Sequence, residues 1–409
     1  MPGAKPQTAE PMWPGTGLDL SHSANSRDQS ERFQSTVSGY RRGTVRPGVA
    51  RLDDAFSKAE LNQQTSGPVS GRWQRASGAG RADGGFVGAT GGRHTTGEPR
   101  FDQAVGPGAY LWWYVDAISD DGQHALSVIA FVGSVFSPYY NRAFKAQGAA
   151  VQAGNHCAIN VALYGGGRRR WAMTERGSAS VERDAEHFRV GPSQMSWRGD
   201  HLEIKLDEFS VPIPQRVRGT VRVYPQSLCN YNNALDDARR HRWGPIAPCA
   251  RVEVELAKPG LRWQGNAYLD SNEGDEPVTI PFKTWDWSRA RMADGSTAVI
   301  YDVTQLNGVR TLLAERFKSD GSWQSFDPAA ERENLPATFW RVDRGIRADA
   351  GSTSRVTETL EDTPFYTRSL LQTQLLGEQV TAMHETLEPQ RLNNLAVQMM
   401  LPFRMPRRA

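Results

Sequence analysis

The chain has 409 residues and a formal net charge of +3, with 23% charged and 38% hydrophobic residues. The excess positive charge lies in the first 100 residues, which hold 13 Lys and Arg against 9 Asp and Glu, whereas the remaining residues hold 35 against 36. A nearly neutral chain lacks the basic surface that binds nucleic acid, so no nucleic-acid partner is expected. The length allows two or three domains with a sizeable core.

The three cysteines, Cys157, Cys229 and Cys249, lie far apart and form no CxxC pair. They indicate neither a disulfide framework nor a zinc site, and they favour a reducing compartment. The first residues lack the pattern of a secretion signal, and no stretch reaches the ~18 apolar residues of a membrane-spanning helix. We therefore expect a soluble protein, or one that lies on a membrane surface.

Residues 1–100 contain 16 of the 39 glycines, and their apolar residues follow neither a period of 2 nor one of 3.6. This composition predicts a largely disordered Gly/Ser/Arg-rich extension.

From Phe101 onward the sequence changes to short strand-like segments. Residues 201–209 and 251–256 alternate apolar and polar side chains, and 124–136 is a longer apolar run typical of a strand buried on both faces. Asp-Gly pairs, the hairpin dipeptides, follow at 121–122, 294–295 and 320–321. The pattern predicts an all-β protein of well over ten strands, in a sandwich or barrel because an open sheet would leave too much edge.

A faint internal repeat suggests two related β lobes. Trp112 and Trp285 each stand nine residues before an Asp-Gly pair, and "WRGD" at 197–200 is matched by "WRVD" at 340–343. We predict two β barrels with a seam between them, as an N-terminal lobe (101–260) and a C-terminal lobe (261–365).

The last segment, 366–409, has a different pattern. Its apolar residues approximate helical spacing up to Pro389, and its end mixes Met, Leu and Phe with Arg404, Arg407 and Arg408. We predict a C-terminal helix followed by a basic tail. The tail could pack back on the barrels, or it could contact an anionic bilayer surface.

The strand "LRWQGNAYLD" (261–270) leads into an acidic cluster, "SNEGDEP". Period-2 alternation puts Tyr268 and Asp270 on one face, about 7 Å apart. The cluster does not fit a calcium loop, because Gly274, Asp275 and Pro281 stand where an EF-hand needs a ligand, a glycine and a glutamate. We interpret "SNEGDEP" as a turn that ends the strand, with solvated acids.

A second pair with the same spacing lies upstream, where His241 and Trp243 precede a Gly-Pro turn. The chain contains no motif of a serine hydrolase, phosphate loop, dinucleotide site or zinc protease. A carboxylic acid in an apolar cavity stays protonated because burial disfavours its anion. Aromatic faces stabilise a nearby cation by about 2 kcal/mol or more when they are shielded from water. These four side chains together suit protonation of an alkene.

At these residues the sequence resembles the carotenoid 1,2-hydratases (hydroxyneurosporene synthases) of purple phototrophic bacteria. The resemblance covers Phe101 to the C-terminus and rests on the motifs "VGPGAYLWWYVDAISDDG", "GSVFSPYYNRA", "HCAINVALYG", "CNYNNALDDARRHRWGPIAP" and "AYLDSNEGDEP". It implies a two-lobed lipocalin-like β fold and addition of water, without a cofactor, to the terminal C1=C2 bond of acyclic carotenes such as neurosporene and lycopene.

The resemblance also implies that His241, Trp243, Tyr268 and Asp270 are important for activity. We expect Asp270 to protonate C2, Trp243 and Tyr268 to face the cation at C1, and either His241 or the Asp270 carboxylate to activate water. Trp112 and Trp113 are further candidates for substrate binding.

The expected partners are acyclic carotenes, a membrane surface on the cytoplasmic side, and other enzymes of carotenoid synthesis; no metal is expected. Two alternatives remain at this point. One is a lipocalin-like carrier of carotenoid or lipid without catalysis. The other is a carbohydrate-active enzyme that pairs Asp270 with Glu273 or Asp275.

Overall fold

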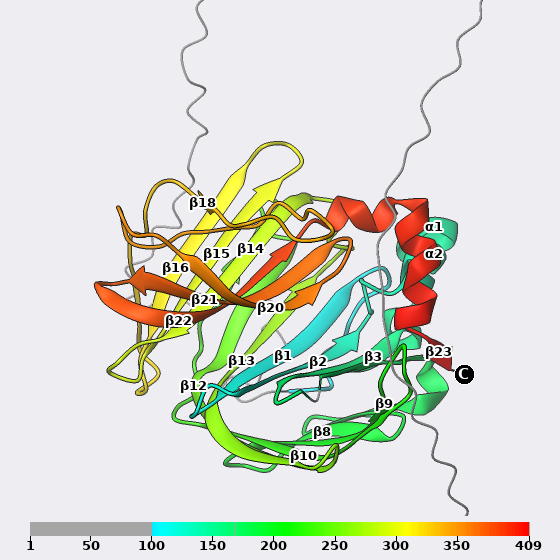
Figure 1. Ribbon diagram of the computed structural model, residues 1–409. Helices are drawn as coiled ribbons and strands as arrows, with labels where there is room; N and C mark the ends of the chain where they lie inside the picture. Colours follow the sequence, from blue (N-terminus) through cyan, green and yellow to red (C-terminus); the bar gives the residue numbers. More distant parts are fainter. Residues whose placement is uncertain (1–99, 168, 409) are drawn as a thin grey trace, which may run out of the picture. The chain divides into compact units, whose positions relative to one another are not determined.

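The computed structural model describes residues 100–167 and 169–408. The predicted N-terminal extension therefore lies outside the described residues, except for Arg100. The described residues belong to one compact unit, which consists of two large β-sheets, antiparallel except for one short parallel pair at an edge of the first, with short helices at one side (Figure 1).

The first sheet has fourteen strands, and β13 and β12 lie near its middle. Twelve strands follow one path, in the order β23 (Arg407–Arg408), β5 (Glu175–Arg176), β3 (Cys157–Gly165), β2 (His124–Val132), β1 (Tyr110–Ser119), β13 (Leu261–Gly274), β12 (His241–Lys258), β10 (Arg216–Pro225), β9 (Leu202–Phe209), β8 (Ser193–Trp197), β7 (His187–Val190) and β6 (Val181–Arg183). Two more strands lie off this path, since β4 (Arg170–Met173) pairs with β3 and β11 (Asn233–Ala234) pairs with β12.

This sheet curls around a mainly aliphatic core, called the aliphatic core below. The core contains Val115 of β1, Val161 of β3, Ile204 of β9 and Val254 of β12, all fully buried. The predicted strands at 201–209 and 251–256 belong to this sheet, as does the predicted strand at 124–136 up to Val132, and Asp121-Gly122 forms the β1–β2 turn.

The second sheet has seven strands, in the order β17 (Trp323–Ser325), β16 (Arg310–Phe317), β15 (Thr297–Gln305), β14 (Phe282–Arg291), β22 (Glu378–Leu387), β21 (Tyr366–Leu375) and β20 (Arg355–Asp362). The other two predicted Asp-Gly turns connect β14 to β15 and β16 to β17. A small ladder of β18 (Glu333–Asn334) and β19 (Gly345–Ile346) accompanies this sheet.

A second core, rich in aromatic residues, lies between the two sheets. Alternation along β1 directs Trp112 and Tyr114 into this core, and directs Trp113 and Val115 into the aliphatic core of the first sheet. From the facing sheet, Trp285 of β14 approaches Trp112, with ring centroids 6.3 Å apart. The two tryptophans of the faint sequence repeat thus meet at the seam between the sheets.

Two of the predicted boundaries are wrong. Residues 261–274 form β13, which pairs with β12 and β1 inside the first sheet, so the N-terminal lobe does not end at 260. Residues 366–387 form β21 and β22 of the second sheet instead of a helix. The helical spacing was misleading because this sheet is buried on both faces. Leu370 enters the aromatic core, and Leu371 enters a third hydrophobic core on the other face of the sheet.

The helices are short and lie beside one edge of the molecule in Figure 1. The α-helices are α1 (Pro138–Gln147) and α2 (Leu395–Arg404), and four 3-10 turns occur at Gly148–Ala150, Ala153–Asn155, Ser178–Ser180 and Pro389–Asn393. Helix α1 was not predicted, although Ser137 caps it and Pro138 begins it, a common helix start. None of the helices in the described ranges is long and apolar enough to cross a membrane.

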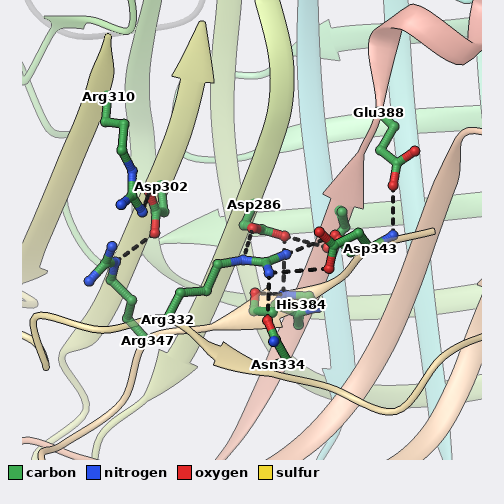
Figure 2. A network of polar contacts seen from close by, with 11 residues as sticks. Asp286, Asp302, Arg310, Arg332, Asn334, Asp343, Arg347, His384 and Glu388 are labelled. Atoms are coloured by element: carbon green, nitrogen blue, oxygen red, sulfur yellow. Dashed lines mark hydrogen bonds and ion pairs between the residues drawn. The ribbon is translucent and has the colours of Figure 1, made fainter. Parts of the chain in front are cut away.

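An ion-pair network covers the outer face of the second sheet (Figure 2). Arg332 contacts Asp286 of β14 at 2.7 Å, and Arg347 contacts Asp302 of β15 at 2.6 Å. His384 of β22 lies within the same network and bonds the carbonyl of Gly345. These contacts hold the segment between β17 and β20 on the outer face of the sheet. The inner face contributes to the cavity described next.

Candidate active site

A cavity of ≈ 310 Å³ lies between the two sheets and reaches helix α2. Its walls are mostly aromatic and apolar, with few charged groups. The residues that bear on the chemistry are Trp112, Tyr114, Asp270, Asn272, Trp285, Trp287, Tyr301, Arg368 and Glu385, and at the α2 end Val397, Met400, Leu401 and Phe403.

Strand β13 brings Tyr268 and Asp270 together on the face that forms the aromatic core, as the alternation predicted. The Tyr268 hydroxyl donates a 2.7 Å hydrogen bond to Oδ2 of Asp270. The indole N–H of Trp243 donates a 2.8 Å bond to the same oxygen. All three side chains are fully buried or nearly so. Three of the four predicted site residues therefore form one hydrogen-bonded group.

Trp243 pairs with Asn272 of β13, which makes it a diagonal neighbour of Asp270 on the adjacent strand. Asp270 pairs with Pro245, and the pairing becomes irregular just beyond it. A proline is tolerated there because a bulge does not need its missing N–H. The Trp243 ring packs against Tyr301 of the second sheet, with centroids 4.7 Å apart, which holds the indole N–H toward the carboxyl group.

Burial raises the pKa of Asp270 to about 8, although the hydrogen bonds from Tyr268 and Trp243 act in the opposite direction. The group is therefore mostly a neutral acid at pH 7. Both donors occupy Oδ2, whereas Oδ1 is buried and has no hydrogen-bond partner among the described residues. Because Asp270 lines the cavity, Oδ1 is the oxygen that can carry a proton to a bound molecule.

His241 lies in a different place from the one we expected for a base. Its Nδ1 is 2.9 Å from the hydroxyl of Tyr110, and its ring packs edge-on against Phe282 at 4.7 Å. It pairs with Gly274, four residues beyond Asp270 on β13, and it does not line the cavity. Burial lowers its pKa to about 3. His241 supports the wall, since Tyr110 stacks on Trp112 at 4.8 Å.

The two candidate tryptophans of β1 lie on opposite faces of the strand. Trp112 lines the cavity, as predicted. Trp113 points into the aliphatic core of the first sheet, where it packs against Phe101 at 4.9 Å. The structure therefore places Trp113 away from the cavity, because neighbouring residues of a strand face opposite sides.

The acidic cluster after Asp270 is a solvated turn only in part, since Asp275 is exposed beyond the strand end but Glu273 is buried within the strand. Strand β13 continues to Gly274 because it has a partner strand on each side. Glu273 is buried and pairs with Arg242 at 2.6 Å, and Arg242 also pairs with Asp275 at 2.9 Å. Glu276 pairs with Arg240 at 2.6 Å. These acids form ion pairs at the strand end, and neither Glu273 nor Asp275 lines the cavity with Asp270.

The sequence analysis missed the second sheet's contribution to the cavity. Trp285 and Trp287 of β14, and Tyr301 of β15, project into it from that sheet. The spacing of the two tryptophans in "KTWDWS" was a signal, because residues at i and i+2 of a strand share a face. The sequence could not show that this face lies opposite Asp270.

A second polar group in the cavity consists of Glu385, Arg368 and Tyr114. The Tyr114 hydroxyl donates a 2.6 Å bond to Oε1 of Glu385, and Arg368 contacts the same oxygen at 2.7 Å. Tyr114 is the cross-strand neighbour of Asp270. The charge of Glu385 contributes to the raised pKa of Asp270.

In the described ranges, no three His, Cys, Asp or Glu side chains are placed so that they could hold a metal ion. The arrangement can supply one proton, from Asp270, to a molecule that is surrounded by aromatic faces. It defines a lipocalin-like β protein with an aromatic cavity at the seam of its two lobes and a neutral carboxylic acid in the wall.

Comparison with known proteins agrees with this description. Residues 128–409 match the family model of the carotenoid hydratase CrtC. The chain is 54% identical to an acyclic carotenoid 1,2-hydratase of Rubrivivax gelatinosus, over 92% of this chain and 93% of that protein. It is 49% identical to the enzyme of that name from Thiocapsa roseopersicina, over 93% of each.

A crystal structure from Nitrosomonas europaea, provisionally named AttH, has a similar fold, with a TM-score of 0.50 and 15% identity over 68% of this chain and 92% of that one. The chain belongs to the CrtC carotenoid hydratase family, whose members are hydro-lyases. The family and the lipocalin-like β fold expected from the sequence are confirmed.

Proposed function

We propose that this protein adds water to the terminal C1=C2 bond of an acyclic carotene such as neurosporene or lycopene, giving a 1-hydroxy carotenoid without a cofactor. The observation that carries the proposal is the state of Asp270: a buried acid with a pKa of about 8 that lines an aromatic cavity and has one oxygen, Oδ1, without a hydrogen bond among the described residues.

Asp270 acts as the acid in the first step. The Oδ1–H bond breaks, its proton goes to C2, and the electron pair of the double bond forms the new C2–H bond. This leaves a tertiary cation at C1. Protonation at C2 is favoured over protonation at C1 because the more substituted cation results. Tyr268 and Trp243 then stabilise the new carboxylate through their hydrogen bonds to Oδ2.

Aromatic rings from both sheets stabilise the cation. Trp112 approaches from the first sheet, and Trp285, Trp287 and Tyr301 from the second. A cation over such a ring gains about 2 kcal/mol or more when water is excluded. A pocket with few polar atoms also keeps stray water from the cation, so that one positioned water molecule reacts.

Water attacks C1 in the last step and loses a proton to the Asp270 carboxylate, which restores the acid. We assign this proton to Asp270 instead of His241, because His241 is hydrogen-bonded to Tyr110 and lies outside the cavity wall. A pKa of about 8 makes the Asp270 carboxylate a better base than an ordinary aspartate.

Incubation of the purified protein with lycopene in deuterated water tests the proposal. The product should gain one water, with one deuterium at C2. The Asp270→Asn variant should lose about 10²- to 10⁴-fold in rate, the usual contribution of a general acid, while its fold and its ability to bind lycopene remain. Normal turnover by this variant would contradict the assignment, and lycopene bound but unchanged by the wild type would favour a carrier.

We also propose that the carotene enters from a membrane surface on the cytoplasmic side. At the α2 end the cavity is bordered by side chains that are themselves exposed, including Phe403, Met400 and Pro212. Next to them, Leu395, Met399 and Ile213 are also exposed. Exposed apolar side chains around a cavity mouth would allow a long apolar chain to pass from lipid into the site.

A further inference from the structure

Asn272 is a buried polar side chain in the cavity wall that the proposed reaction has not yet used. It is 2% exposed, and it lines the cavity two residues after Asp270 on the same face of β13. Its amide nitrogen Nδ2 is buried and has no hydrogen-bond partner in the part of the chain that the structure describes. A buried amide donor costs free energy unless something accepts its hydrogen bond, so this position indicates a polar ligand.

The orientation of the Asn272 amide is fixed by the second sheet. The Tyr301 hydroxyl donates a 3.3 Å hydrogen bond to its Oδ1. The carbonyl side of the amide is therefore occupied, and the N–H side remains for a ligand. Tyr301 itself is held by the Trp243 ring, so the amide and the carboxyl of Asp270 are positioned by the same packed group.

Strand geometry places Asn272 and Asp270 about 7 Å apart along the sheet, at the distance of two residues. A water molecule that accepts a hydrogen bond from Nδ2 can lie between the two side chains. Oδ1 of Asp270 is likewise without a hydrogen-bond partner within residues 100–167 and 169–408. A free donor and a group that alternates between acid and carboxylate thus lie next to each other on one wall.

We propose that Asn272 holds the water molecule that attacks the cation; this inference rests on the proposed function. The water oxygen accepts the Nδ2–H bond with one lone pair and attacks C1 with the other. As the C–O bond forms, one O–H bond breaks and its proton goes to Oδ1 of the Asp270 carboxylate. The step needs no redox partner and no further reactant. Both new bonds, C2–H and C1–O, form on the face of the alkene that lies toward β13.

Glu385 is another polar group in the wall that could hold water, and its contacts argue against it. Its Oε1 already accepts hydrogen bonds from Tyr114 and Arg368. The Arg368 guanidinium is buried and forms an ion pair with it, so the Glu385 carboxylate is committed to that pair. A carboxylate held by two donors is a poor proton acceptor. The Asn272 N–H, in contrast, is free to donate a hydrogen bond to water.

The test measures, in deuterated water, how often the cation is captured by water and how often it loses a proton instead. A cation that is not captured by water returns to an alkene by losing a proton, which leaves deuterium in the recovered carotene. The Asn272→Leu variant keeps a similar volume and leaves Asp270 intact. We expect its hydration rate to fall at least about tenfold, while deuterium continues to enter the recovered carotene, so the ratio of exchange to hydration rises by a similar factor.

Two further variants complete the test. Tyr301→Phe removes only the hydroxyl that orients the amide, and should shift the ratio in the same direction by a smaller factor. Ser271→Ala is the control: its hydroxyl donates to the carbonyl of Gly244, it is not a cavity residue, and its ratio should equal that of the wild type.

A parallel fall of exchange and hydration in Asn272→Leu, or an unchanged ratio, would overturn the role of Asn272. Failure of the proposed function gives a different result, because wild-type product without deuterium at C2 would exclude the protonation step itself.

Discussion

The indole N–H of Trp243 and the hydroxyl of Tyr268 both donate to one oxygen of Asp270, at 2.8 and 2.7 Å. The two donors come from neighbouring strands, β12 and β13. Their convergence leaves the other oxygen of Asp270 free to hold a proton and to transfer it. Several measurable properties depend on this arrangement.

The pH dependence of the reaction should follow Asp270. The acid must be protonated, and its pKa is about 8 because it is buried. We expect the hydration rate to be nearly constant from pH 5 to 7 and to fall about tenfold per pH unit above the pKa. His241, with a pKa of about 3, should add no limb in this range. Initial rates in detergent-dispersed lycopene measure this profile, and a rate that does not fall above pH 8 would contradict Asp270 as the acid.

Replacement of Trp243 by Phe should change both rate and pH profile. The ring is kept, but a donor that lowers the pKa of Asp270 is lost. The alkaline limb should therefore move to higher pH, while the maximal rate falls roughly tenfold, which corresponds to about 1.4 kcal/mol of lost transition-state stabilisation. The same measurement on Trp113→Phe should show an unmoved limb, since Trp113 lies in the other core. A limb that moves downward in Trp243→Phe would contradict this role.

The buried ion pair between Arg289 of β14 and Asp116 of β1 connects the two sheets. Replacement of Arg289 by Met would leave the Asp116 charge buried without its partner. We expect the free energy of unfolding to decrease by roughly 3–5 kcal/mol, as measured for broken buried pairs. Urea unfolding followed by tryptophan fluorescence would measure it.

The matched control for Arg289 is Arg262→Met, which breaks the exposed pair with Glu255. Because solvent screens that pair, its loss should cost at most about 1 kcal/mol. Equal losses in the two variants would show that the Arg289 pair contributes no more than a surface contact.

Binding to lipid should depend on the exposed face of α2. Phe403 is 77% exposed at the cavity mouth, and Leu306 is 53% exposed on the β15–β16 turn. We expect Phe403→Glu to reduce cosedimentation with phospholipid vesicles several-fold, and Leu306→Glu to leave it unchanged. Equal effects, or none, would contradict entry at α2. Point variants are preferable to deletion of the tail, because Val397 and Leu401 of α2 belong to the aromatic core.

Much of the fold could be predicted from local patterns. Alternation and the Asp-Gly pairs indicated the strands and the hairpin turns, because period-2 burial and turn chemistry depend on only a few neighbouring residues. The prediction failed where both faces of a strand are buried: without alternation, 366–387 was taken for a helix. It also failed at β13, which was assigned to the C-terminal lobe, because strand pairing between distant segments leaves no local pattern.

The candidate site, like the fold, could be predicted only in part. The sequence by itself determined that Tyr268 and Asp270 share a face and that His241 and Trp243 share another, since both follow from the spacing of side chains along a strand. Only the tertiary structure decided that Trp243 reaches Asp270 while His241 bonds Tyr110, and that Trp112 enters the cavity while Trp113 does not. Which face of a strand meets a second sheet depends on contacts with other segments of the chain, such as that of Trp243 with Tyr301. The raised pKa of Asp270 is a property of that packed environment, because it arises from burial and not from the residue's neighbours in sequence.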